Sequence, residues 1–227
     1  MPEAIEPQGI CTGERGCLKV LFIGESTFAG VGVATHEEGF AGTLAKELCA
    51  STRKTIDWRV YARSGYTAKK VTEKILPKIT ESSANLIIVG LGGNDAFMLN
   101  SPRKWEAEVR ELITNLKAKF GHTPIVFANM PPIKEFPAFT AIIKFSIGNL
   151  VEILGAALAE VVKEFENVYC NSEVLTLKEW IKKLNISANQ TDFFSDGVHP
   201  SKLTYQSWGK DLSIFILNQK AIKKFFG

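Results

Sequence analysis

The chain has 227 residues, of which 45% are hydrophobic and 22% are charged, and its formal net charge is +3 at pH 7. These values are ordinary for a globular protein, and the length suits one α/β domain or at most two small ones. A net charge this small, without an arginine-rich run, does not indicate binding to nucleic acid. The composition therefore excludes a strongly basic or disordered protein and favours one folded domain.

Residues 1–17 are polar and contain several prolines and glycines. They include no basic segment followed by an apolar one, so they do not resemble a signal peptide. We therefore expect a loosely ordered N-terminal extension, residues 1–17, before a domain that spans 18–227, and a cytoplasmic location. No uncharged apolar stretch is long enough to predict a transmembrane helix.

The four cysteines form no Cys-x-x-Cys pair and do not cluster with histidine, so the sequence predicts no metal site. In a chain that can build its own core, four cysteines are typical of free thiols in a reducing compartment. The short spacing between Cys11 and Cys17 leaves a local disulfide open.

Short apolar runs alternate with longer segments of helical periodicity along the chain. The runs cover 18–24, 55–61, 86–91, 124–130 and 168–170. Those at 86–91 and 124–130 are continuously apolar, which is typical of strands buried on both faces, whereas 55–61 alternates partly and 168–170 is short. The segments between them carry apolar stripes at helical spacing, and they cover 71–79, 105–120, 150–165 and 205–216. Two of these helices begin behind Ser101-Pro102 and Pro200-Ser201. The pattern predicts a parallel sheet of about five strands with helices on both faces.

Three polar or glycine-containing segments follow the first three predicted strands. They contain Ser26, Gly65 and Asn94, in that order. Because ligands bind beyond the carboxyl ends of the strands in open α/β sheets, we expect all three residues at one edge. Ester hydrolysis needs a nucleophile and donors for an oxyanion. Ser26 is a candidate nucleophile, and the backbone N–H groups of Ser26 and Gly65, with the Asn94 side chain, are candidate donors.

The candidate base comes from a set of three histidines. His122 precedes a predicted strand and so lies at the wrong edge, whereas His36 could reach the correct edge but has no obvious acidic partner. His199 follows Asp196 by three residues, and a carboxylate so placed can orient an imidazole. His199 and Asp196 are therefore the predicted base and its orienting acid, although Asp196-Gly197 alone would also suit a turn.

These segments resemble the motif blocks of the SGNH (GDSL-type) hydrolases. The matching residues are Ser26, Gly65, Asn94 and His199, with Asp196 as the triad acid. The resemblance implies a flavodoxin-like three-layer α/β/α sandwich and hydrolysis of small-molecule esters or thioesters without metal or cofactor. The chain departs from the family in one position, because the usual Gly-Asp-Ser reads Gly-Glu-Ser at 24–26.

A serine esterase is thus the expected function, and two alternatives stay open. One is an acyl or acetyl transferase that uses the same acyl-enzyme, and the other is a non-catalytic flavodoxin-like binding domain. Residues 131–145 are richer in Phe and Ile than an exposed loop, so they form either the start of a core helix or a surface for an acyl chain or for peripheral lipid contact. On the second interpretation, Phe139 and Ile142 are candidate substrate-binding residues. Nothing in the sequence indicates the oligomeric state.

Overall fold

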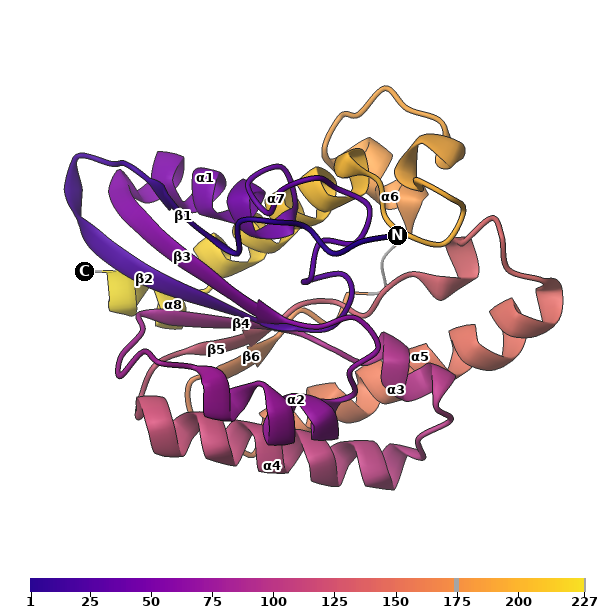
Figure 1. Ribbon diagram of the computed structural model, residues 1–227, viewed down its shortest axis with the longest axis horizontal. Coiled ribbons are helices and arrows are strands. Elements are labelled where there is room, and N and C mark those ends of the chain that lie inside the picture. Colours follow the sequence, from indigo (N-terminus) through magenta and orange to yellow (C-terminus); the bar gives the residue numbers. More distant parts are fainter. Residues whose placement is uncertain (174–175, 227) are drawn as a thin grey trace.

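The computed structural model describes residues 1–173 and 176–226, and in this part of the chain one six-stranded sheet forms the centre of the fold (Figure 1). The strand order is β1-β3-β2-β4-β5-β6. All neighbouring strands pair in parallel except β1, which is antiparallel to β3. The strands are β1 (Gln8–Cys11), β2 (Arg15–Gly24), β3 (Lys54–Ala62), β4 (Leu86–Gly90), β5 (Ile125–Phe127) and β6 (Val168–Cys170).

Helices cover both faces of this sheet. They are α1 (Phe40–Thr52), α2 (Ala68–Lys74), α3 (Gly93–Phe97), α4 (Pro102–Phe120), α5 (Ala141–Val162), α6 (Leu177–Lys183), α7 (Lys202–Asn218) and α8 (Lys220–Lys223). Helix α1 packs beside α7 on one face, whereas α4 packs between α2 and α5 on the other (Figure 1). This three-layer α/β/α arrangement confirms the predicted fold class.

The helix starts follow from local capping. The side chains of Ser101, Thr140 and Ser201 each accept a hydrogen bond from the backbone N–H three residues later, which satisfies a donor that the helix leaves unpaired. The apolar stripe of α4, which includes Trp105 and Leu112, is buried against the sheet. The helix starts at Ser101 and Ser201 and the buried stripe of α4 agree with the prediction from the sequence.

The N-terminal segment differs from the expected loose extension. Residues 8–11 form the edge strand β1, and the N–H of Val60 donates to the carbonyl of Pro7 at 2.7 Å. Further upstream, the N–H of Ala4 donates to the carbonyl of Ala29 at 2.9 Å. Strand β1 therefore pairs with an edge of β3 that would otherwise be open.

Candidate active site

The site lies where β2, β3 and β4 end together. Gly24 at the end of β2 pairs with Ala62 of β3 and Gly90 of β4, so the three strands stop at one edge of the sheet. The predicted residues follow these ends: Ser26 comes after β2, Gly65 after β3 and Asn94 in the first turn of α3, after β4. The structure therefore brings the three segments to the common edge that the sequence predicts.

The carboxylate of Glu25 ties the segment of Ser26 to that of Asn94. Its Oε1 accepts a hydrogen bond from the N–H of Gly93 at 2.9 Å, and its Oε2 accepts one from the N–H of Asn94 at 2.9 Å. A Cβ at Gly93 would lie 2.9 Å from Oε1, so glycine is needed there for the carboxylate to approach. This bridge fixes the start of α3 relative to the nucleophile candidate.

Glu25 is 3% exposed, and this burial has an electrostatic consequence. Burial raises the pKa of Glu25 to about 8, although the N–H groups of Asn94 and Gly93 act in the opposite direction. The sequence did not predict this role. The signal that could have found it is the departure from Gly-Asp-Ser, because an acid directly after a buried strand must find donors.

The side chain of Asn94 ties α3 to the segment of Gly65. Its Nδ2 donates to the carbonyl of Tyr66 at 3.1 Å, which uses one of the two amide protons. Together with the Glu25 bridge, this bond joins residues next to Ser26, Gly65 and Asn94 into one network. The three candidate oxyanion donors thus belong to segments that are held together directly.

The neighbouring Asp95 has a structural role. Its carboxylate accepts hydrogen bonds from the N–H of Ala68 at 3.1 Å and from Nδ2 of Asn100 at 2.8 Å. Burial raises the pKa of Asp95 to about 6, against the effect of these two donors. Its contacts join α3 to the start of α2 and to the chain beyond α3, so it supports the loop that carries Asn94.

Two backbone N–H groups at this edge remain available to a ligand. Among the described residues, neither Ser26 nor Gly65 donates its N–H to a protein acceptor. Gly65 is exposed and has φ of 78°, a conformation that glycine adopts without strain. The described structure thus leaves these two N–H groups without a protein acceptor, in segments that are hydrogen-bonded to Asn94 or its neighbours.

His199 and Asp196 form a tight local pair. Nδ1 of His199 lies 2.8 Å from Oδ2 of Asp196, while Oδ1 accepts the N–H of His199 at 2.8 Å and that of Val198 at 3.0 Å. The backbone N–H of His199, followed by its imidazole and the N–H of Val198, lowers the pKa of Asp196 to about 2. The aspartate therefore holds the imidazole through Nδ1 and leaves Nε2 available.

The loop of His199 meets the loop that follows Ser26. The N–H of Val31 donates to the carbonyl of Ser26 at 3.2 Å, and Oη of Tyr205 in α7 donates to the carbonyl of Val31 at 2.7 Å. A Cβ at Gly32 would lie 2.3 Å from the carbonyl oxygen of Pro200, which shows how closely the two loops approach. Among the described residues, no hydrogen bond joins Ser26 Oγ to His199, and such bonds often tighten only when substrate binds.

The other histidine near this edge has a different environment. His36 is buried, and its burial lowers the pKa of the imidazole to about 4. In the part of the chain that the structure describes, no carboxylate lies within ion-pair distance of its ring. These observations distinguish His36 from the paired His199.

The candidate substrate-binding residues lie beside this edge. Phe139 is half-buried, and its ring lies 5.7 Å from that of Phe97 at the end of α3. The N–H of the preceding Ala138 donates to the carbonyl of Gly197 at 3.1 Å, in the loop of His199. Ile142 is 79% exposed in the first turn of α5. The segment of Phe139 therefore spans the distance between α3 and the histidine loop.

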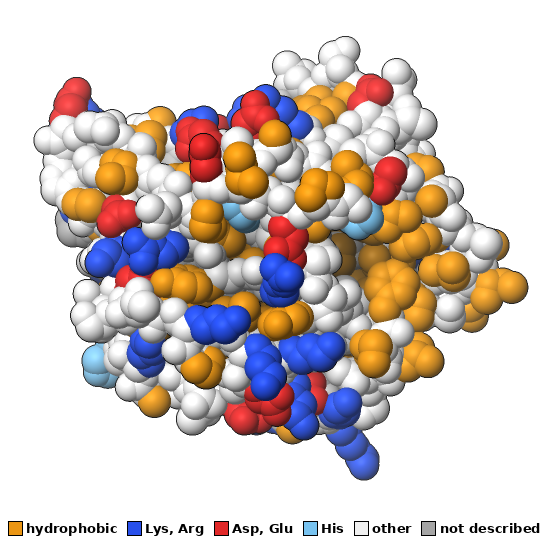
Figure 2. All heavy atoms as spheres, in the orientation of Figure 1, with side chains coloured by type: hydrophobic (Ala, Val, Ile, Leu, Met, Phe, Trp, Pro, Cys, Tyr) orange, Lys and Arg blue, Asp and Glu red, His pale blue; other side chains and the backbone are white. Residues whose placement is uncertain are grey.

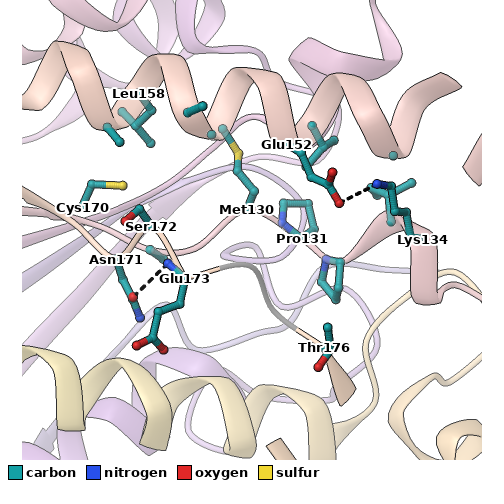
Figure 3. A pocket seen from close by; sticks show the side chains of 18 of the residues that line it. Met130, Pro131, Lys134, Glu152, Leu158, Cys170, Asn171, Ser172, Glu173 and Thr176 are labelled. Carbon is teal, nitrogen blue, oxygen red and sulfur yellow. Dashed lines mark hydrogen bonds and ion pairs between the residues drawn. The ribbon is translucent and has the colours of Figure 1, made fainter. Parts of the chain in front are cut away.

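A separate cavity of about 370 Å³ lies between α5 and the loops that follow β5 and β6 (Figure 3). Its walls are mostly apolar and include Met130, Pro131, Leu158 and Cys170, a free thiol like the other three cysteines. None of the predicted site residues lines it. The cavity borders the site indirectly, because a Cβ at Gly93 would lie 3.2 Å from Cγ of Pro131.

Comparison with known proteins identifies the family. The profile of the GDSL-like lipase/acylhydrolase family matches residues 22–206, most of the chain. The chain belongs to this family. GDSL-like lipases and acylhydrolases cleave acyl esters, so the chain is a carboxylic ester hydrolase. No curated protein matches the sequence. The described residues contain no group of three or more His, Cys, Asp or Glu side chains that could hold a metal ion.

Several solved structures share the fold of this chain. TesA is 17% identical, with a TM-score of 0.64 over 91% of this chain and 99% of its own. A family 3 carbohydrate esterase from Clostridium thermocellum is 15% identical, with a TM-score of 0.64 over 93% of this chain and 100% of its own. A lipase/acylhydrolase from Enterococcus faecalis is 15% identical, with a TM-score of 0.59 over 88% and 95%. At these identities the comparison shows a shared fold.

Proposed function

We propose that the chain hydrolyses carboxylic esters through a covalent acyl-enzyme on Ser26. Ser26 Oγ attacks the acyl carbon while Nε2 of His199 takes its proton, and the leaving alcohol then receives this proton from the imidazolium. Asp196 orients His199 and stabilises its charged form. In the second half of the reaction, His199 activates a water molecule that attacks the acyl-enzyme and releases the acid.

The hydrogen-bond network that joins the segments of Ser26, Gly65 and Asn94 is the observation that carries the proposal. The tetrahedral intermediate places a negative charge on the former carbonyl oxygen, and preorganised donors stabilise that charge. The N–H groups of Ser26 and Gly65 and the side-chain amide of Asn94 are the proposed donors. Because Glu25 and the carbonyl of Tyr66 hold these segments, the donors need little reorganisation during the reaction.

The test is covalent labelling with a fluorophosphonate, combined with hydrolysis of soluble p-nitrophenyl esters. We expect one adduct, on Ser26, and loss of nearly all activity in Ser26→Ala, since removal of a triad serine costs on the order of 10⁶ in kcat. Ser64→Ala is the matched control, because Ser64 is an exposed serine near the same edge, and it should retain labelling and activity.

An adduct on another residue, together with an active Ser26→Ala variant, would exclude this mechanism. Product analysis with added alcohols then distinguishes hydrolysis from acyl transfer. If the acyl group passes mainly to an added alcohol rather than to water, the enzyme is a transferase with the same acyl-enzyme.

A further inference from the structure

Helix α5 is unusually apolar for a helix that is so little buried. It has 22 residues and is long and apolar enough in composition to cross a membrane, yet only 28% of its most apolar 18-residue stretch is buried. Its second half packs on the domain, where Nε1 of Trp105 donates to the carbonyl of Leu154 at 2.9 Å. The helix is therefore part of the folded domain, and its first half presents apolar side chains to solvent.

These side chains continue onto the end of α3. Ile142 and Phe145 of α5 are 79% and 74% exposed, and Met98 and Leu99 after α3 are 69% and 70% exposed. We call this surface the apolar rim, and it consists of Phe97, Met98, Leu99, Ile142 and Phe145. Hydrophobic side chains gather at this end of the molecule in Figure 2. A contiguous exposed apolar surface is typical of a site that contacts a partner or a membrane.

The backbone supports the outward position of the rim. Leu99 has φ of 53°, in the left-handed region that bulky side chains rarely adopt. Residues held in this region persist only where surrounding structure imposes it, and they concentrate at functional sites. Here the N–H of Leu99 donates to the carbonyl of Ala96 at 2.9 Å, which fixes the turn. The turn leaves a large apolar side chain in solvent rather than in the core.

The rim borders the candidate active site on two sides. Phe97 lies on the same short helix as Asn94, and its ring contacts that of Phe139. Phe139 follows Ala138, which is hydrogen-bonded to the loop of His199. A surface that covered the rim would therefore lie next to both the proposed oxyanion donors and the proposed base.

Two basic residues lie next to the rim along the chain. Arg103 lies four residues beyond Leu99, in the first turn of α4, and Lys144 lies between Ile142 and Phe145 in α5. Among the described residues, neither of these cations has a carboxylate within ion-pair distance. An apolar surface with unpaired cations at its border suits an anionic lipid interface.

We propose that the apolar rim docks peripherally on anionic lipid bilayers and that the substrates are esters presented at that surface. A second copy of the chain fits less well, because a two-fold dimer would bring the same cations of both copies together. The nature of the substrate rests on the proposed esterase function, whereas docking itself requires no catalysis. The two parts can therefore fail separately.

The experiment measures binding to vesicles of phosphatidylcholine with 30% phosphatidylglycerol, by flotation, for the wild type and the double variant Met98→Ser/Phe145→Ser. We expect the double variant to bind at least tenfold more weakly. The matched control is Ile5→Ser/Ile10→Ser, which removes two exposed apolar side chains from the N-terminal edge of the sheet, and it should bind like the wild type. Replacing Arg103 and Lys144 by Gln should remove the preference for anionic over pure phosphatidylcholine vesicles.

Activity assays separate docking from catalysis. Met98→Ser/Phe145→Ser should hydrolyse a soluble p-nitrophenyl ester at the wild-type rate but a vesicle-embedded ester at least tenfold more slowly. Absence of vesicle binding by the wild type, or equal losses in the control, would overturn the docking proposal. So would light scattering that shows a wild-type dimer and a monomeric rim variant, since a second copy would then cover the rim. Vesicle binding without hydrolysis of any soluble ester would leave docking in place and contradict the proposed function.

Discussion

Glu25→Gln is the substitution that tests the electrostatics beneath the proposed oxyanion site. The carboxylate is buried and accepts one N–H on each oxygen, from Gly93 and Asn94. Two effects oppose each other, because burial disfavours the charged form and the two donors favour it. Burial is the larger effect, and it raises the pKa of Glu25 to about 8 from an ordinary value of 4.5.

The sign of the pH dependence follows from proton binding. Because the pKa of Glu25 is about 8 in the folded protein and 4.5 in the unfolded chain, the folded protein binds more protons at this site between pH 4.5 and 8. The free energy of unfolding therefore decreases as pH rises through this range, by up to about 1.4 kcal/mol per pH unit. Glutamine does not titrate, so the variant lacks this contribution. Other groups with shifted pKa values, such as Asp95, are present in both proteins, so their contributions to the pH dependence cancel in the comparison.

Urea unfolding of both proteins at pH 5.5, 6.5 and 7.5 measures the effect. We expect the free energy of unfolding of Glu25→Gln to gain roughly 3 kcal/mol relative to the wild type across these two pH units. Parallel pH profiles, with the variant less stable by a constant amount, would refute the reasoning. That result would mean that the two N–H donors outweigh burial and that Glu25 is ionised throughout.

Four further substitutions test the proposed site. Asn94→Ala should lower kcat on p-nitrophenyl esters by roughly 10²–10³ with a smaller effect on KM, and a change in KM alone would make Asn94 a ground-state binding residue. His199→Gln should abolish hydrolysis while His36→Gln retains it in the same assay, and the reverse would assign the base to His36. Gly65→Ala should reduce the free energy of unfolding by about 1–2 kcal/mol, since φ is 78° there, and unchanged thermal and urea unfolding would contradict this cost.

The main strands and helices could be predicted because their sequence patterns are strong. The run at 86–90 is apolar at almost every position and forms β4, buried on both faces. Strand β1 was missed because Gln8–Cys11 is short and half-exposed, and its pairing with β3 depends on a distant edge. For α5, periodicity predicted the stripe that contains Leu154 and Leu158, but it could not show that Phe145 would lie in solvent. Whether a helical side chain is exposed depends on which other segments of the folded chain pack against it.

The positions of Ser26, Gly65 and Asn94 could also be predicted, because each of them follows a recognisable strand. The hydrogen bonds that hold these residues together could not be predicted from the sequence. The contacts of Glu25 with the start of α3, and of Asn94 with the carbonyl of Tyr66, join residues 69 and 28 positions apart. No local pattern encodes such pairs, since they depend on how β2, β3 and β4 align.

The position of the first residue affects how this protein should be produced for assays. Oγ of Ser195 lies 3.6 Å from Sδ of Met1, so the start of the chain touches the loop that carries Asp196 and His199. Helix α8 lies on the other side of the molecule (Figure 1). An affinity tag fused before Met1 would begin beside the proposed base and could obstruct substrate, whereas a tag placed after α8 would lie away from it. Kinetic comparisons between variants are therefore best made with C-terminally tagged or untagged protein.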